Sequence, residues 1–338
     1  MTGIPQSALE FIRVQTERLR AIRRKQRIVF PEGSDPRVIE AAIRLKREDL
    51  LEPILLGPKP EGAPSGLRYI DPATGAAAAK YGRLYFERRR AKGILEVEAA
   101  SIARRPLYFG ALMVGVGDAD GFVGGAVNTT AETVRAALHC IGTPPKVRTV
   151  SSVFVVCVHD RAYGHNGLLA FSDCGIVIDP TPVELAEIAI ATAASTRVLI
   201  GAEPHVAMLS FSTKGSGRHE FVDKVVEAVR IIRARAPELD VDGELQADAA
   251  LVPSVGASKA AGSTVAGRAN TLIFPDLASG NIGVKLVERL GAAVTYGPFL
   301  QGLSKAANDL SRGCSAEEIY GVAIVTALQA EAAAHAAF

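Results

Sequence analysis

The chain has 338 residues, of which 48% are hydrophobic and 22% are charged, a composition typical of a globular protein and unlike that of a disordered one. Its 38 basic and 36 acidic residues leave a net charge of +2. This balance gives no overall field for nucleic acid, so any anion binding has to come from local clusters. The length suggests two domains.

In chain order, strand-like and helix-like segments alternate, which predicts an α/β fold with parallel sheet. In the first half we expect strands at 27–30, 52–57 and 118–127, the last one broken by glycines, and helices at 35–48, about 76–91 and 128–142. In the second half we expect strands at 149–158 and 205–211, a helix from Pro182, a helix at 221–236, a strand, loop and helix over 270–291, and a C-terminal helix over 326–337. Two of these helices begin with the spacing of a capping box, Thr129 with Glu132 and Thr181 with Glu184.

The N-terminal segment, the apolar runs and the cysteines indicate the cellular compartment. The N-terminal segment is positively charged but lacks the apolar run of a signal peptide, and no stretch of about 18 uninterrupted apolar residues occurs. The four cysteines, 140, 157, 174 and 314, form no CxxC pair, which favours reduced thiols over disulfides or zinc. We therefore expect a cytoplasmic protein that does not enter a membrane. The six histidines show no HExxH spacing, so no metal site is predicted.

Three strand-to-helix loops carry residues that anion sites need. STKGSGR (212–218) has the glycines and lysine of a phosphate loop but lacks the GxxxxGK[ST] pattern, so a phosphate site and a plain turn remain equally supported. In the second loop, 124–135, Arg135 falls in the second turn of a capped helix. Arg135 could share one anion with the loop amides, although the pattern alone favours a surface charge.

The third loop, NDLSRGCSAEEI (308–319), contains Ser311 and Arg312 in a short polar turn. Ser315 and Glu318 have capping-box spacing, which explains Glu318 without any catalytic role. Ser311 has no histidine partner nearby and no GxSxG motif, which argues against a serine hydrolase. The absence of GxGxxG after the first strand disfavours a dinucleotide-binding fold.

Together these segments resemble the phosphate acetyltransferase (phosphotransacetylase) family over nearly the whole length. The resemblance rests most on IVFPEGSDPRVIEAA, STKGSG, DGELQ and NDLSRGCS, which occur in the family's order. It implies two α/β domains with a cleft between them, similar to the isocitrate and isopropylmalate dehydrogenase fold. The first domain would comprise 1–146 plus 300–338, around an inserted second domain, 147–299. A homodimer is also implied.

The resemblance further implies a reversible reaction of acetyl-CoA and phosphate to acetyl phosphate and CoA. Coenzyme A and acetyl-CoA would be substrates, with no permanently bound cofactor, no metal and no nucleic-acid partner. The catalytic residues would be Ser311, Arg312 and Glu318, where Glu318 stands in place of the family's aspartate. The coenzyme A contacts would fall on Arg89 (flanked by two further arginines), Thr130, Arg135 and Arg289.

These residue types suit the implied chemistry. Both substrates are polyanions, which guanidinium groups neutralise well, and a carboxylate could remove the thiol proton of CoA, a step worth roughly 10²–10⁴-fold. Nothing marks Cys314 as activated, so direct transfer without an acetyl-enzyme is expected. The alternatives are a phosphate acyltransferase for propionyl or butyryl groups, and a non-catalytic acyl-CoA-sensing domain. A decarboxylating dehydrogenase of related fold lacks any nicotinamide signature here.

Overall fold

The computed structural model describes residues 3–74, 77–145 and 147–336. Its backbone contacts divide it into two compact units. We call residues 14–144 with those from 303 onward the first unit, and the described residues up to 13 with 145–302 the second unit. In the second unit, the Ser7 hydroxyl donates to the carbonyl of Val158 at 2.7 Å.

The first unit is built on a parallel sheet with strand order β3-β2-β1-β4-β11. Its strands are β1 (Arg27–Phe30), β2 (Glu52–Leu56), β3 (Arg68–Ile70), β4 (Gly121–Gly124) and β11 (Ala307–Asp309). Because parallel strands end at the same edge of a sheet, the loops that follow β1, β4 and β11 meet at one edge, the usual place for a ligand site in an α/β fold.

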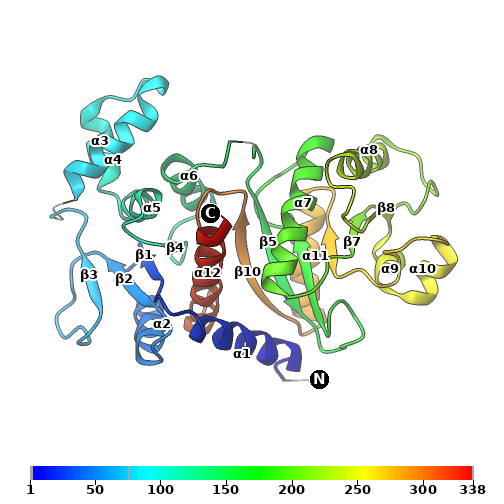
Figure 1. The fold of residues 1–338 in the computed structure, drawn as a ribbon, viewed down its shortest axis with the longest axis horizontal. Coiled ribbons are helices and arrows are strands. Elements are labelled where there is room, and N and C mark those ends of the chain that lie inside the picture. Colours follow the sequence, from blue (N-terminus) through cyan, green and yellow to red (C-terminus); the bar gives the residue numbers. More distant parts are fainter. Residues whose placement is uncertain (1–2, 75–76, 146, 337–338) are drawn as a thin grey trace. The chain divides into compact units, whose positions relative to one another are not determined.

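Helices cover both faces of this sheet (Figure 1). The helices of the first unit are α2 (Pro36–Arg47), α3 (Ala78–Arg89), η1 (Arg90–Lys92), α4 (Glu96–Ala103), α5 (Pro106–Val116), α6 (Thr130–Cys140) and α12 (Ala316–Ala336), of which α3 and α4 pack on one another and on α5, while α1 (Gln6–Arg20) begins among residues of the second unit. Helices α2 and α12 pack together on one face, and α5 and α6 pack on the other around a core that includes Phe109, Phe122 and Tyr81.

The second unit has a mixed sheet of order β10-β5-β6-β9-β7-β8, antiparallel across β10, β5 and β6 and parallel beyond. Its strands are β5 (Ser151–Cys157), β6 (Leu168–Ser172), β7 (Val206–Leu209), β8 (Val241–Leu245), β9 (Thr271–Ile273) and β10 (Val294–Gln301). Its helices are α7 (Pro182–Leu199), α8 (Glu220–Arg235), α9 (Ala247–Leu251), α10 (Pro253–Lys259) and α11 (Leu277–Leu290). Successive residues of β7 enter two separate cores, one under α7 and α8 and one toward α9 and α11, as expected for a sheet buried on both faces.

The α/β prediction is confirmed, and local signals located the helix starts. Thr129 and Thr181 cap α6 and α7 with both hydrogen bonds of the capping box. The strand expected over 118–127 is shorter, only Gly121–Gly124, because Gly125 turns the chain with φ of 111°. Within the described ranges, no helix is both long enough and apolar enough to cross a membrane.

Candidate active site

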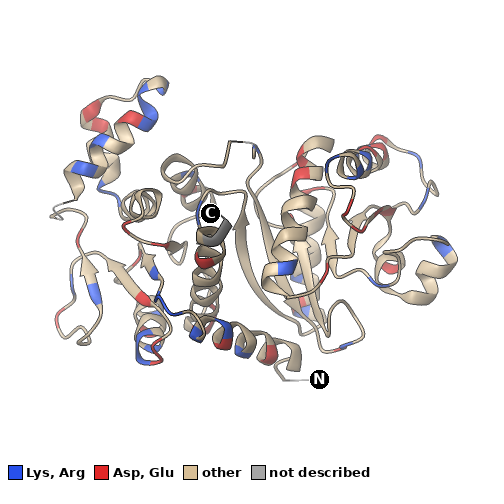
Figure 2. Cartoon of the chain, viewed as in Figure 1, with Lys and Arg blue, Asp and Glu red and all other residues tan. Residues whose placement is uncertain are grey.

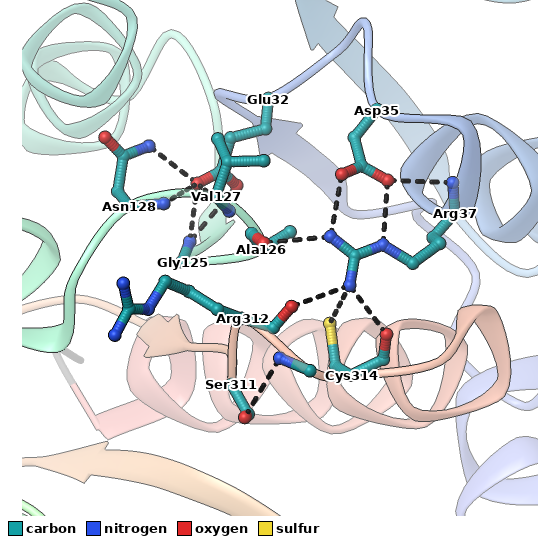
Figure 3. Close-up of polar contacts among 11 residues, drawn as sticks. Glu32, Asp35, Arg37, Gly125, Ala126, Val127, Asn128, Ser311, Arg312 and Cys314 are labelled. Atoms are coloured by element: carbon teal, nitrogen blue, oxygen red, sulfur yellow. Dashed lines mark hydrogen bonds and ion pairs between the residues drawn. The ribbon is translucent and has the colours of Figure 1, made fainter.

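Three loops meet at the carboxyl edge of the first unit's sheet: the β1–α2 loop (31–35), the β4–α6 loop (125–129) and the β11–α12 loop (310–315). Two of them were singled out from the sequence. The β1–α2 loop was seen only as the start of a helix, yet it organises the other two. Figure 3 shows the contacts that it makes.

Glu32 of the β1–α2 loop is buried and holds the β4–α6 loop through backbone amides. Its carboxylate accepts from the amide of Gly125 at 2.9 Å and from those of Val127 and Asn128 at 3.3 and 3.4 Å. The side-chain amide of Asn128 adds a bond of 2.7 Å. The loop amides considered above for a ligand anion are therefore occupied by a carboxylate of the chain itself.

Arg37, at the second position of α2, joins all three loops. Its guanidinium forms a two-point ion pair with Asp35, with Nε to Oδ1 at 3.0 Å and NH2 to Oδ2 at 2.8 Å. It also donates to the carbonyl oxygens of Ala126, Arg312 and Cys314, each at 2.9 Å. The hydrogen bonds from Arg37 lower the pKa of Asp35 and keep that carboxylate charged.

Ser311 and Arg312 are exposed at the start of the β11–α12 loop. The Ser311 hydroxyl accepts from the amide of Gly313 at 3.3 Å. The Arg312 guanidinium extends away from Arg37 (Figure 3), and within the described residues it forms no ion pair. An exposed arginine without a carboxylate partner can bind an anion, because its planar fork matches phosphate oxygens.

Glu318 completes the capping box at the start of α12. Its Oε2 accepts from the amide of Ser315 at 2.6 Å and from the Ser315 hydroxyl at 3.0 Å. The neighbouring Glu317 pairs with Arg44 instead, on the side of α2. The carboxylate of Glu318 is thus held in the first turn of α12, just after the loop that carries Ser311 and Arg312, while Glu317 is paired with Arg44.

Asp309, the last residue of β11, is a carboxylate that sequence reasoning missed. It is only 1% exposed, and its Oδ2 accepts from the Thr130 hydroxyl at 2.6 Å, which ties β11 to the first turn of α6. Among the described groups, its Oδ1 has no hydrogen-bond partner. Burial raises the pKa of Asp309 to about 6. Thr130, expected to contact coenzyme A, here orients this carboxyl group.

Arg89 and Arg135, which are 46 positions apart in sequence, both act electrostatically on His139. Arg89 ends α3 and Arg135 lies on α6, and the pKa of His139 is lowered first by burial and then by these two charges. The Tyr85 hydroxyl meets the Nδ1 of His139 at 3.0 Å. Arg105, which the sequence reasoning did not select, stands 5.4 Å from the ring centre of Tyr108.

We call Arg89, Arg105 and Arg135 the arginine cluster, because all three charges act on Tyr108. None forms an ion pair with another described residue. Of the two arginines beside Arg89, Arg90 pairs with Glu87 at 3.3 Å, and the charge of Arg88, like that of Arg89, acts to lower the pKa of the buried Cys140. Figure 2 shows basic residues recurring along α3 and the turn after it.

A hollow of ≈ 290 Å³ lies between the β1–α2 loop, the β4–α6 loop and the start of α5. Glu32 and Asp35 line it from one side, and Arg105 and Asn128 from the other. The hollow therefore joins the loop contacts of Figure 3 to one member of the arginine cluster.

The remaining predicted residues belong to the second unit. Arg289 is exposed in the last turn of α11. The STKGSG loop is held by Glu244, whose buried carboxylate accepts from the Ser212 hydroxyl at 2.8 Å and the Gly215 amide at 2.7 Å. Lys214 pairs with Asp242. These contacts favour the plain-turn interpretation of STKGSG, because its donors are satisfied by the DGELQ strand.

The cysteines are poor nucleophiles. All four are buried and free, and burial raises the pKa of Cys314 to about 11 and that of Cys140 to about 12. A thiol reacts as its thiolate, so neither is activated at neutral pH. In the part of the chain that the structure describes, no three His, Cys, Asp or Glu side chains gather as they would around a metal ion.

Comparisons with known proteins agree with one another. The family described as phosphate acetyl/butaryl transferase matches residues 11–327. A phosphate acetyltransferase of Acetivibrio thermocellus is 46% identical over 311 residues, or 90% of this chain and 94% of the relative. One of Bacillus subtilis is 44% identical over 313 residues, or 90% and 94%. A solved phosphotransacetylase from Streptococcus pyogenes superposes with a TM-score of 0.90 at 46% identity, covering 97% of this chain and all of that one.

Proposed function

We propose that this chain, which belongs to the phosphate acetyl/butaryl transferase family, transfers an acetyl group reversibly between coenzyme A and inorganic phosphate. The observation that carries the proposal is the arrangement of the β11–α12 loop. It presents the hydroxyl of Ser311 and the guanidinium of Arg312, which forms no ion pair with another described residue, and the carboxylate of Glu318 follows in the exposed first turn of α12. Coenzyme A is a substrate here and not a permanently bound cofactor.

Charge neutralisation is the first task of such a site. Coenzyme A carries a pyrophosphate and a further phosphate, and the second substrate is itself phosphate. We assign coenzyme A to the arginine cluster and phosphate to Arg312, because none of these four guanidinium groups forms an ion pair with another residue that the structure describes. Arg289 and Thr130 remain proposed contacts to coenzyme A, supported only by the family resemblance.

The chemical step then needs a base and no covalent enzyme intermediate. Toward acetyl phosphate, the Glu318 carboxylate accepts the proton of the attacking phosphate, a phosphate oxygen attacks the thioester carbonyl carbon, the C–S bond breaks, and Glu318 passes the proton to the leaving thiolate. In reverse, the Glu318 carboxylate accepts the thiol proton of CoA, the thiolate attacks the carbonyl carbon of acetyl phosphate, the C–O bond to the phosphate breaks, and the leaving phosphate takes the proton from Glu318. Arg312 and Ser311 stabilise the negative charge on the phosphate oxygens and on the oxygen of the carbonyl under attack. The raised pKa of Cys314 supports direct transfer.

The family description covers both acetyl and longer acyl groups, so chain length needs its own test. Purified protein should release CoA from acetyl-CoA only when phosphate is present, and faster than from propionyl-CoA or butyryl-CoA. One methylene in an apolar pocket is worth about 1–3 kcal/mol, so the preference should be measurable. CoA release that does not depend on phosphate would contradict the proposal, and preference for butyryl-CoA would change the substrate.

We also propose that the protein is a cytoplasmic homodimer. The four free, buried thiols suit a reducing compartment. Helix α11 exposes Ile282, Leu286 and Leu290, spaced four residues apart and 57%, 51% and 82% exposed, an apolar stripe that a second copy could cover. Light scattering should give twice the chain mass for the wild type and the single mass for Leu286→Glu. A monomeric wild type would contradict the dimer.

A further inference from the structure

We propose that Arg37 is a positioning residue for the transfer reaction: it ties the loop of Ser311 and Arg312 to the β4–α6 loop and fixes the direction in which the Arg312 guanidinium faces the substrates. The inference rests on the proposed function, because it concerns the same site. Nothing in the sequence pattern of α2 sets Arg37 apart from the other arginines of that helix.

The guanidinium of Arg37 has no N–H donor left for a substrate. A guanidinium has five N–H donors. Nε and one NH2 hydrogen bind the two oxygens of Asp35, the other NH2 hydrogen binds the carbonyl of Ala126, and NH1 binds the carbonyls of Arg312 and Cys314. All five donors are used inside the protein. Arg37 therefore acts on the reaction through the loops that it holds.

The carbonyl oxygens of Arg312 and Cys314, which Arg37 binds, determine the conformation of the β11–α12 loop. The carbonyl of Arg312 faces Arg37 while its side chain extends the other way (Figure 3). Holding that carbonyl fixes the peptide plane after Arg312 and hence the direction of its side chain. The carbonyl of Cys314 is held by the same nitrogen, so the loop is fixed on both sides of Gly313. A shift of about 1 Å in such a group can cost about 10²-fold in rate.

A lysine at position 37 cannot replace the hydrogen bonds that Arg37 makes to Asp35 and to the three backbone carbonyls. A lysine has three donors on one nitrogen and cannot span a carboxylate and three carbonyls in a plane. Arg37→Lys thus keeps the positive charge and removes the geometry. If only the charge of Arg37 mattered, this variant would behave as the wild type.

The chain offers a closely matched control in Arg27, at the opposite end of β1. Its guanidinium also forms a two-point ion pair, with Asp120 at 3.0 and 2.9 Å, and also donates to two backbone carbonyls, those of Asp118 and Gly117, at 2.9 and 2.8 Å. The two side chains are similarly exposed, 33% for Arg27 and 31% for Arg37. Arg27→Lys should therefore cost similar stability without touching the carboxyl edge.

The experiment compares Arg37→Lys and Arg27→Lys with the wild type, by melting temperature, by steady-state kinetics with acetyl phosphate and CoA, and by hydrogen exchange of peptides covering 125–128 and 311–315. Both variants should melt earlier by similar amounts. Arg37→Lys should lower kcat roughly 10–10²-fold, with the KM for CoA within about threefold of wild type. Arg27→Lys should keep kcat within about twofold. Only Arg37→Lys should speed exchange in the two loops.

Equal kcat in the two variants, or unchanged loop exchange in Arg37→Lys, would overturn the inference while leaving the proposed function standing. A wild type without phosphate-dependent acetyl transfer would reject the proposed function instead. In that case the exchange comparison would still decide whether Arg37 holds the loops. Asp35→Asn provides a second variant, because losing the two-point ion pair should reproduce a weaker form of the Arg37→Lys effect.

Discussion

Replacing Glu318 with glutamine separates the two roles that the structure gives this residue. Glutamine can still accept the hydrogen bonds from the amide and hydroxyl of Ser315, and it is an accepted residue at this position of a capping box. Stability should therefore change by no more than about 0.5 kcal/mol. The general base would be lost, and turnover should fall at least about 10²-fold, which corresponds to about 2.7 kcal/mol in activation free energy.

The assay is thioester formation from acetyl phosphate and CoA, with the affinity for CoA measured separately and expected to stay unchanged. Glu317→Gln is the matched control, because its carboxylate pairs with Arg44, and it should keep turnover within about twofold. Ser315→Ala should cost about 1 kcal/mol of stability through the cap but leave the rate nearly intact. Wild-type turnover in Glu318→Gln, or an equal loss in Ser315→Ala, would refute a catalytic role for Glu318.

Three further predictions concern the same unit. Arg89→Ala and Arg135→Ala should each raise the KM for CoA more than that for phosphate, and equal effects on both would argue against their assignment to coenzyme A. Cys314→Ser should keep most of the activity, since the raised pKa leaves the thiol protonated; loss of activity with an acetylated wild-type thiol would contradict direct transfer. Burial raises the pKa of Asp309 from 3.8 to about 6, so the folded state binds its proton more tightly than the unfolded chain does. That stabilisation is complete below about pH 4 and is lost as the pH rises through 6, so the melting temperature of the wild type should fall relative to Asp309→Asn between pH 4 and 7. If the melting temperatures of the wild type and Asp309→Asn change equally with pH, the raised pKa of Asp309 is refuted.

Local signals predicted the elements well wherever the physics is local. The strand Arg27–Phe30 was expected at its observed bounds, and the capping box of Thr129 and Glu132 located the start of α6. A capping box satisfies amides a few residues away and needs no distant partner, so the sequence shows it directly. Glycines were expected to interrupt the strand at 118–127, and the backbone conformation of Gly125 decides that β4 ends at Gly124.

The site was predicted only in part, because its support comes from distant residues. Ser311, Arg312 and Glu318 were assigned from the family resemblance of one short motif, and their catalytic roles stay a prediction. Glu32 and Arg37 act on loops about 90 and 275 residues away in sequence, and no spacing rule connects them. The segment IVFPEGSDPR predicts a strand and a loop that open a helix at the carboxyl edge of a parallel sheet, where loops converge, but it does not show which of its side chains hold the other loops.

The predicted anion-binding loops also depend on residues that are distant in sequence. Glycine-rich loops in both units present donors that look ready for phosphate. Glu32 and Glu244 occupy those donors from neighbouring strands and loops. A sequence pattern can show that a loop has backbone amides that could bind an anion. Only the fold shows whether a carboxylate of the protein itself already binds those amides.

Thioester formation by the purified protein tests the central claim most directly. With acetyl phosphate and CoA, the protein should form acetyl-CoA and release phosphate in equal amounts, and Arg312→Ala should lose most of this activity while still folding. Hydrolysis of acetyl phosphate without thioester formation, or full activity in Arg312→Ala, would contradict the account.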